Sequence, residues 1–287
     1  MKAEVILITP EMAKEFLKRN VRNRKLSQRT VIKYADDMKK GRWTLNGETI
    51  QFNKKGELQN GQHRLNAIIL ANVPILVLVV TGIEDERAFE TIDQGLMRGA
   101  HTILQLKGVS NANRMVSIAK KLLLWDQTED KGSFSISVRK SLSNSEIADY
   151  YEEHKEEINL VYDIIKDATI LRTSKSYSAV ITALTLCFRY NPSEALPFIE
   201  KFKTGANLSE NSPILLLRNK LTHVTTKDGG RRWEIEVMAL IIKAFNDYAA
   251  GKTRRLLRWN LETEKFPTPL KKISFLKEVQ QQLWKLN

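Results

Sequence analysis

Two hydrophobic patterns divide the chain. In its first third, residues 49–52 alternate as in a strand, and residues 73–80 form a nearly continuous, valine-rich run. Such a run is typical of a strand that is buried on both faces. After Gly99 the strand signal is weak, and helical periods follow one another to the end of the chain. We therefore expect an α+β protein, with a small α/β domain over residues 1–104 and an all-α helical domain over residues 105–287.

Capping residues mark the helix starts of the first domain. Thr9-Pro10-Glu11 supplies an N-cap, a proline at the first helical position and an acid in the first turn. Ser27 caps a second predicted helix, and a short third helix is expected at residues 84–92, with Gly95 as its C-terminal cap. The second predicted helix has an apolar stripe of Val31, Tyr34, Ala35 and Met38.

Helical signals dominate the second domain. Ser143-Asn144-Ser145-Glu146 forms a capping box, in which the serine and the glutamate satisfy each other's backbone donors. Periodic apolar positions predict helices at residues 110–126, 174–190, 194–203, 212–222, 232–250 and 272–285.

A tight turn joins the strand at residues 49–52 to a helix that begins near Gln62. Gly61 in this turn can adopt a positive φ, or let a ligand approach the backbone. The first N–H groups of the helix lack intrahelical partners, and with the helix dipole they attract anions, phosphate above all. Arg64 adds a planar fork that suits phosphate, and His63 adds a donor that titrates near neutral pH. From these residues alone, a phosphate cradle and an ordinary capped turn with a surface charge both remain open.

The composition of the chain limits the classes of binding partner that we expect. The 287 residues are 42% hydrophobic and carry a formal net charge of +13, which favours polyanions such as nucleic acid. The single cysteine, Cys187, lies in an apolar run and is expected in the core, and without a Cys/His cluster we expect no structural zinc. No apolar run approaches the roughly 18 residues of a membrane span, so we expect a cytoplasmic protein with no membrane partner.

Two basic stretches stand out. Residues 14–42 contain eleven Lys or Arg and three Asp or Glu, which is either a solvated helical face or a positively charged rim near the turn. We favour the rim because Arg42 leads directly into the strand before the turn. The second stretch, with Lys252, Arg254, Arg255 and Arg258 beside Trp259, either lines nucleic acid or surrounds a core tryptophan.

The segment Gly61-Gln62-His63-Arg64 resembles the G-x-x-R signature of the ParB N-terminal and sulfiredoxin superfamily, and in particular its DGQHR-type branch of bacteria and phages. The resemblance covers about residues 8–104. Its further blocks are the helix at residues 29–40, Gly41-Arg42-Trp43, Asn46-Gly47-Glu48-Thr49-Ile50, the strand at residues 74–80, Phe89-Glu90-Thr91-Ile92-Asp93-Gln94-Gly95 and Arg98. Asn60 departs from the branch, which usually has Asp at this position; if that Asp is catalytic or binds a metal in relatives, this chain binds without turnover.

The resemblance implies a nucleotide site. It assigns phosphate binding to Gly61, Gln62, His63 and Arg64, with Gln94 and Arg98 as a second clamp, and the expected ligand is a nucleoside triphosphate such as CTP or ATP with Mg²⁺. Glu48 is the best-placed carboxylate, as a metal ligand or a catalytic base, with His63 as the second candidate catalytic residue. Nucleic acid, DNA rather than RNA, is expected to contact Arg22, Arg24, Lys25 and Arg42. Whether the chain forms a homodimer stays open.

Three functions remain open. The first is an NTP-dependent, DNA-binding switch of the ParB-like class, which we favour. The second is an enzyme of the same fold, such as an NTP hydrolase, a kinase-like phosphotransferase or a nuclease. The third is a DNA-binding adaptor without turnover. Sulfiredoxin chemistry is disfavoured because Gln62 occupies the position of the cysteine that it needs.

Overall fold

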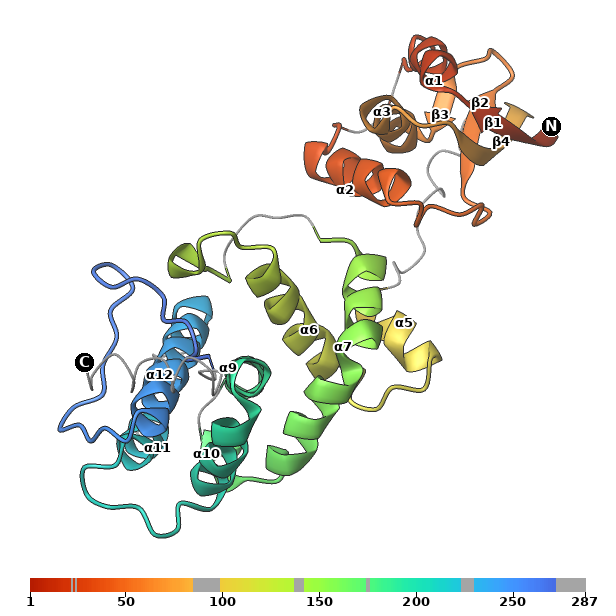
Figure 1. Cartoon of the computed structure of the whole chain (residues 1–287). Helices are drawn as coiled ribbons and strands as arrows, with labels where there is room; N and C mark the ends of the chain where they lie inside the picture. Colours follow the sequence, from red (N-terminus) through yellow and green to blue (C-terminus); the bar gives the residue numbers. More distant parts are fainter. Residues whose placement is uncertain are drawn as a thin grey trace, which may run out of the picture. The chain divides into compact units, whose positions relative to one another are not determined.

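The computed structural model describes residues 1–21, 23, 25–84, 99–136, 142–173, 176–222 and 230–271. Contacts divide the chain into two compact units: the first contains Met1–Ile103 with Arg139–Glu146, and the second contains Leu104–Val138 with Ile147–Asn287. The first unit holds a small mixed sheet, and the second is mostly helical, so the protein is α+β as the sequence predicts (Figure 1). Arg22, Arg24, Gln94, Arg98 and the helices expected at residues 84–92 and 272–285 lie outside the described residues, except Glu84.

The sheet of the first unit has the strand order β1-β4-β2-β3. Its strands are β1 (Lys2–Ile8), β2 (Thr49–Asn53), β3 (Leu58–Asn60) and β4 (Ile75–Ile83). β4 pairs antiparallel with β1 and parallel with β2, whereas β3 is the antiparallel hairpin partner of β2. Neither β1 nor β3 was predicted.

Helices α1 (Pro10–Leu17), α2 (Gln28–Lys39) and α3 (Gln62–Ala71) belong to the same core as the sheet. The predicted caps are confirmed: Thr9 Oγ1 accepts from the Met12 N–H at 3.2 Å, and Ser27 Oγ accepts from the Thr30 N–H at 3.3 Å. α3 connects β3 to β4, packs against α1 and α2, and therefore fixes the turn that precedes it.

One expectation for the sheet is wrong. β4 is not buried on both faces: Val77 and Val79 are buried, but Leu76 is 49% exposed. β1 continues this exposed face, since Leu7 pairs with Leu76 and both Val5 and Leu7 are about half exposed. The sequence did not show the alternation of buried and exposed positions along β4, because apolar residues occupy both faces of this strand.

The second unit is built around α9 (Tyr177–Tyr190), which is buried almost all round and packs against α6, α10 and α12. Its other described elements are α5 (Ala100–Leu106, which begins in the first unit), α6 (Ala112–Asp126), the 3-10 turn η1 (Lys131–Ser133), α7 (Asn144–Ile165, whose first turn to Glu146 belongs to the first unit), α8 (Thr169–Thr173), α10 (Pro192–Thr204), α11 (Pro213–Thr222) and α12 (Arg231–Ala249). Cys187 is fully buried as expected, and burial raises the pKa of its thiol. The Ser143–Glu146 capping box at the start of α7 is confirmed.

Candidate functional site

The turn between β3 and α3 is shaped by Gly61. Gly61 has φ +110° and ψ 1°, a conformation that side chains disfavour, and it is the N-cap of α3. A Cβ built on Gly61 would lie 2.9 Å from Ile50 Cγ1 and 3.2 Å from Ile50 Cα. The glycine therefore lets the turn pack directly on β2, and no side chain caps the N-terminus of α3 at this position.

The side chains that follow Gly61 are buried. Gln62 is 5%, His63 8% and Arg64 9% exposed, which is unusual for three polar residues in succession. Each bonds to a neighbouring segment: Gln62 Oε1 accepts from Asn20 Nδ2 at 3.3 Å, and His63 Nε2 accepts from the Ser27 N–H at 3.0 Å. Because Nε2 is an acceptor here, this nitrogen does not offer a proton to a phosphate in this arrangement.

Arg64 joins the turn to the start of β2. Its Nη1 donates to the Thr49 carbonyl, and its Nη2 lies 2.7 Å from Glu48 Oε2. The two members of this ion pair differ in exposure, since the Arg64 side chain is 11% exposed and that of Glu48 is 60% exposed. The structure thus places the Glu48 carboxylate next to Arg64, where solvent and solvated ions can reach it.

A basic connector between α1 and α2, described at residues 18–21, 23 and 25–27, contacts this turn. Besides the two bonds to Gln62 and His63, the Leu58 N–H donates to the Arg19 carbonyl at 2.8 Å, and Asn23 Nδ2 donates to the Leu58 carbonyl at 2.9 Å. Lys25 is exposed on this connector. The roles of Asn20, Asn23 and Ser27 in holding the connector were missed, because a polar run before a helix gives no sign of its partner in sequence.

Arg42, which we expected in the positively charged rim, lies next to a carboxylate. Its side chain is 20% exposed, and its Nη2 lies 3.7 Å from Glu146 Oε1, where Lys40 Nζ is also 3.3 Å away. Burial raises the pKa of neighbouring Asp37, and the hydrogen bond from Ser143 and the charge of Arg42 oppose this rise only in part. Arg42 thus belongs to an ion-pair cluster with Glu146 at the first turn of α7.

The described residues offer one carboxylate next to the turn as a metal ligand. No group of three or more His, Cys, Asp or Glu side chains in the described part of the chain converges as a metal site. Mg²⁺ commonly takes one or two carboxylates and completes its shell with water and substrate phosphates, so Glu48 fits as a single ligand beside a nucleotide. None of the described helices is long and apolar enough to cross a membrane.

Comparison with known proteins adds no relative. No family model, no curated protein and no solved structure matches this chain.

Proposed function

We propose that the first unit binds a nucleoside triphosphate at the Gly61 turn and that the protein associates with nucleic acid, as a ParB-like, nucleotide-dependent DNA-binding switch. The observation that carries this proposal is the attachment of the basic connector to the turn. Four hydrogen bonds, from Asn20, Asn23, Ser27 and Leu58, hold this connector beside the N-terminus of α3. Its described residues include the cations Lys18, Arg19 and Lys25. Helix N–H groups and neighbouring cations together favour phosphate.

In this proposal the phosphate competes with Glu48 for Arg64. Arg64 is held in place by the Thr49 carbonyl, so its fork is oriented before any ligand arrives. A phosphate that takes the place of Glu48 on Arg64 leaves the Glu48 carboxylate to hold Mg²⁺, which would neutralise phosphate charge. His63 acts as a positioning residue through its bond to the Ser27 N–H.

Isothermal titration with CTP, ATP, GTP and UTP tests this proposal. Glu48→Gln weakens the competing ion pair, so the best-bound nucleotide should bind the variant more tightly than wild type in EDTA. In Mg²⁺ the variant should bind the nucleotide more weakly than wild type, because an amide is a poor ligand for this ion. Glu57→Gln is the matched control, since it removes one charge from the β2–β3 hairpin, where Glu57 accepts from Asn53 Nδ2 at 2.8 Å. Absence of nucleotide binding, or equal shifts in both variants, would refute the site.

The enzyme alternative rests on the exposure of Glu48. A carboxylate that is 60% exposed beside a proposed phosphate site is accessible to an attacking water. Phosphate release measured with and without DNA separates the two functions: a switch that does not hydrolyse releases none, whereas a hydrolase loses release in Glu48→Gln while the nucleotide still binds.

A further inference from the structure

The chain after α12 forms a strap without helix or strand, residues 252–259 of the second unit, with a bend at Arg255. Beyond Gly251, which has φ +65°, the Lys252 N–H donates to the Asp247 carbonyl at 2.8 Å. Arg254 then fixes the strap, because its Nη2 and Nε both donate to the Asp247 carboxylate and its backbone N–H donates to the Asn211 carbonyl at 3.0 Å. The strap is therefore anchored to two separate segments of the unit.

Apolar anchors fix the other end of the strap. Leu257 is 5% and Trp259 7% exposed, and Trp259 Nε1 donates to the Lys265 carbonyl at 3.1 Å. The indole also packs edge-on against Phe266, with ring centroids 5.8 Å apart. Trp259 is thus a core residue, which confirms that interpretation of the sequence, and it offers no exposed ring on which a base could stack.

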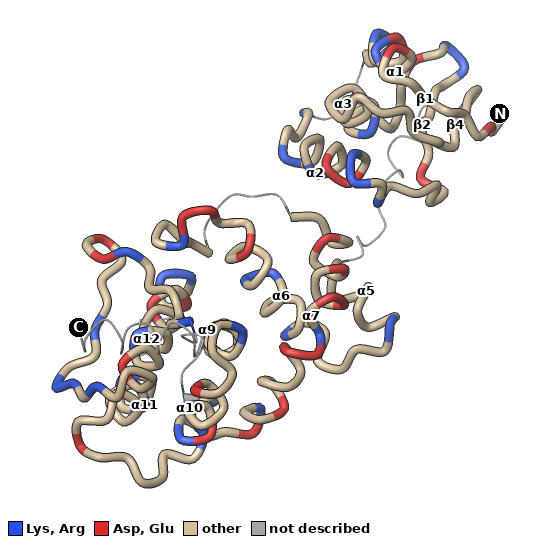
Figure 2. Tube along the Cα trace, in the orientation of Figure 1, with Lys and Arg blue, Asp and Glu red and all other residues tan. Residues whose placement is uncertain are grey.

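Three cations remain on the outside of this strap. Lys252, Arg255 and Arg258 recur at every third position and are exposed, and Figure 2 shows the basic residues of this segment in blue. Within the described residues, none of the three has an acidic group at ion-pair distance. Nearby Glu264 is paired with Lys243 at 2.6 Å, and this pairing, with a smaller contribution from the charge of Arg258, lowers the pKa of Glu264. An extended chain advances at most about 3.6 Å per residue, so the three charges span up to roughly 20 Å.

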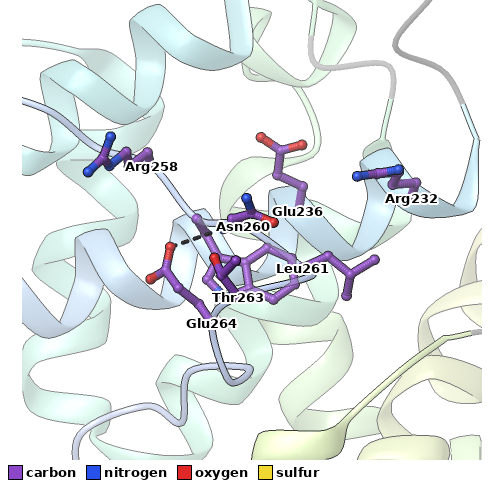
Figure 3. Close-up of a pocket in the computed structure, with 8 residues that line it drawn as sticks. Arg232, Glu236, Arg258, Asn260, Leu261, Thr263 and Glu264 are labelled. Carbon is purple, nitrogen blue, oxygen red and sulfur yellow. Dashed lines mark hydrogen bonds between the residues drawn. The ribbon is translucent and has the colours of Figure 1, made fainter.

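A cavity of about 630 Å³ opens where the strap ends. Arg258 and Trp259 line it together with Arg232 of α12, and the two arginines stand at opposite ends of the labelled group (Figure 3). Its two carboxylates lie near lysines, since Glu264 is paired with Lys243 and Glu236 lies 4.0 Å from Lys220. Arg232 itself is paired with Glu262 at 3.0 Å, so it differs from the three cations of the strap.

We propose that the outer face of the strap binds the phosphate backbone of nucleic acid, with Lys252, Arg255 and Arg258 as contacts. The inference rests on the nucleic-acid association proposed above and assigns it a second surface. A rigid row of like charges matches a polymer with one charge per roughly 1.7 Å of duplex axis. Because Leu257 and Trp259 are buried, we expect the strap to contact the charged phosphates and not the bases.

Fluorescence anisotropy with a labelled duplex of random sequence, titrated over a range of salt, tests the strap. The variant Lys252→Gln/Arg255→Gln/Arg258→Gln removes exposed charges and leaves Arg254 and both apolar anchors intact. The control Lys107→Gln/Lys155→Gln/Lys166→Gln removes the same net charge from lysines that pair with Glu152 or Asp163. We expect the slope of log affinity against log salt to fall by about 0.9 per lost contact in the strap variant, with the control unchanged.

The outcomes separate the strap from the wider proposal. If wild type does not bind the duplex, the nucleic-acid part of the proposed function and the strap both fail. If wild type binds and the strap variant keeps its affinity and slope, the strap alone is refuted and the connector of the first unit remains the candidate. A strap variant that loses binding to poly-glutamate while keeping duplex binding identifies an acidic protein as the partner and overturns the inference.

Discussion

At the scale of single residues, Gly61 is required by packing. A side chain at this position faces two costs, since φ +110° is strained for any L residue and Ile50 Cγ1 lies 2.9 Å from the Cβ position. Gly61→Ala should lower the free energy of unfolding by about 1–3 kcal/mol in chemical denaturation. Gly56→Ala is the control: its φ is +77°, but nothing lies within 4 Å of the Cβ position. If Gly61→Ala lowers the free energy of unfolding no more than Gly56→Ala does, Ile50 can move away from the new side chain without cost.

Asp37 is the residue with the clearest consequence for pH. It is 8% exposed, and burial raises its pKa above the ordinary value even though Ser143 and Arg42 act in the opposite direction. The folded state therefore holds the proton to higher pH than the unfolded state, so stability falls as pH rises from 3.8 through the raised pKa.

Asp37→Asn should remove this pH dependence, since the amide keeps a hydrogen-bonding group without the buried charge. We expect the variant to exceed wild type in free energy of unfolding at neutral pH, and to show a flatter profile as the pH rises above 3.8. Asp36→Asn serves as the comparison, because Asp36 is 46% exposed and pairs with Lys40 at 2.7 Å. Parallel profiles for wild type and Asp37→Asn would contradict the assignment.

At the scale of elements, His63 connects the start of α3 to the start of α2. The Ser27 N–H precedes the first turn of α2 and has His63 Nε2 as its acceptor. His63→Leu leaves this donor unsatisfied and should cost about 1–3 kcal/mol, whereas His63→Gln supplies a carbonyl and should restore part of it. Hydrogen exchange at Thr30 and Val31 should accelerate in the leucine variant, while exchange at Ala13 in α1 stays unchanged. Equal exchange in all three proteins would show that the Ser27 contact does not support α2.

The same elements show what sequence can and cannot reveal. α1, α2 and α3 were predicted closely because their caps and stripes are local: Thr9, Ser27 and Gly61 each stand next to the helix that they start. β1 was missed because its partner, β4, lies about seventy residues away, and pairing between distant strands leaves no local mark. β3 was missed because three residues are too short to show a period.

The candidate site was predictable in its residues and not in its contacts. Gly61, Arg64 and Glu48 were singled out from their order in the chain, and the structure brings Arg64 and Glu48 together at 2.7 Å. Nothing in the sequence indicated that His63 would accept from Ser27, or that Arg42 would lie beside Glu146, since both contacts join distant segments. Side-chain chemistry narrows the list of candidates, but the fold decides which partner each one meets.

At the scale of the whole molecule, the two units have separate cores and should unfold separately. The core of the first unit is formed by residues between Ile8 and Val79, and the second unit is centred on α9. Trp43 is the single tryptophan of Met1–Ile103, where it packs on Tyr34 with ring centroids 4.9 Å apart, so its fluorescence reports on this unit. Trp125, Trp233 and Trp259 are buried in the second unit, and replacing them would disturb its core. The comparison therefore uses Trp43→Phe, and the difference between its fluorescence and that of wild type gives the Trp43 signal.

Nucleotide should then shift one transition only. A ligand that binds a folded unit stabilises it by RT ln(1 + [L]/Kd), which is about 2.7 kcal/mol at a hundredfold excess over Kd. With the nucleotide that binds best, the Trp43-reported transition in urea should move to higher denaturant, while the far-UV signal of the mostly helical second unit keeps its midpoint. Duplex DNA at low salt should shift both transitions if the connector and the strap both bind it. A single transition seen by both probes would show that the units do not unfold independently. A nucleotide effect confined to the helical unit would place the nucleotide site outside the Gly61 turn.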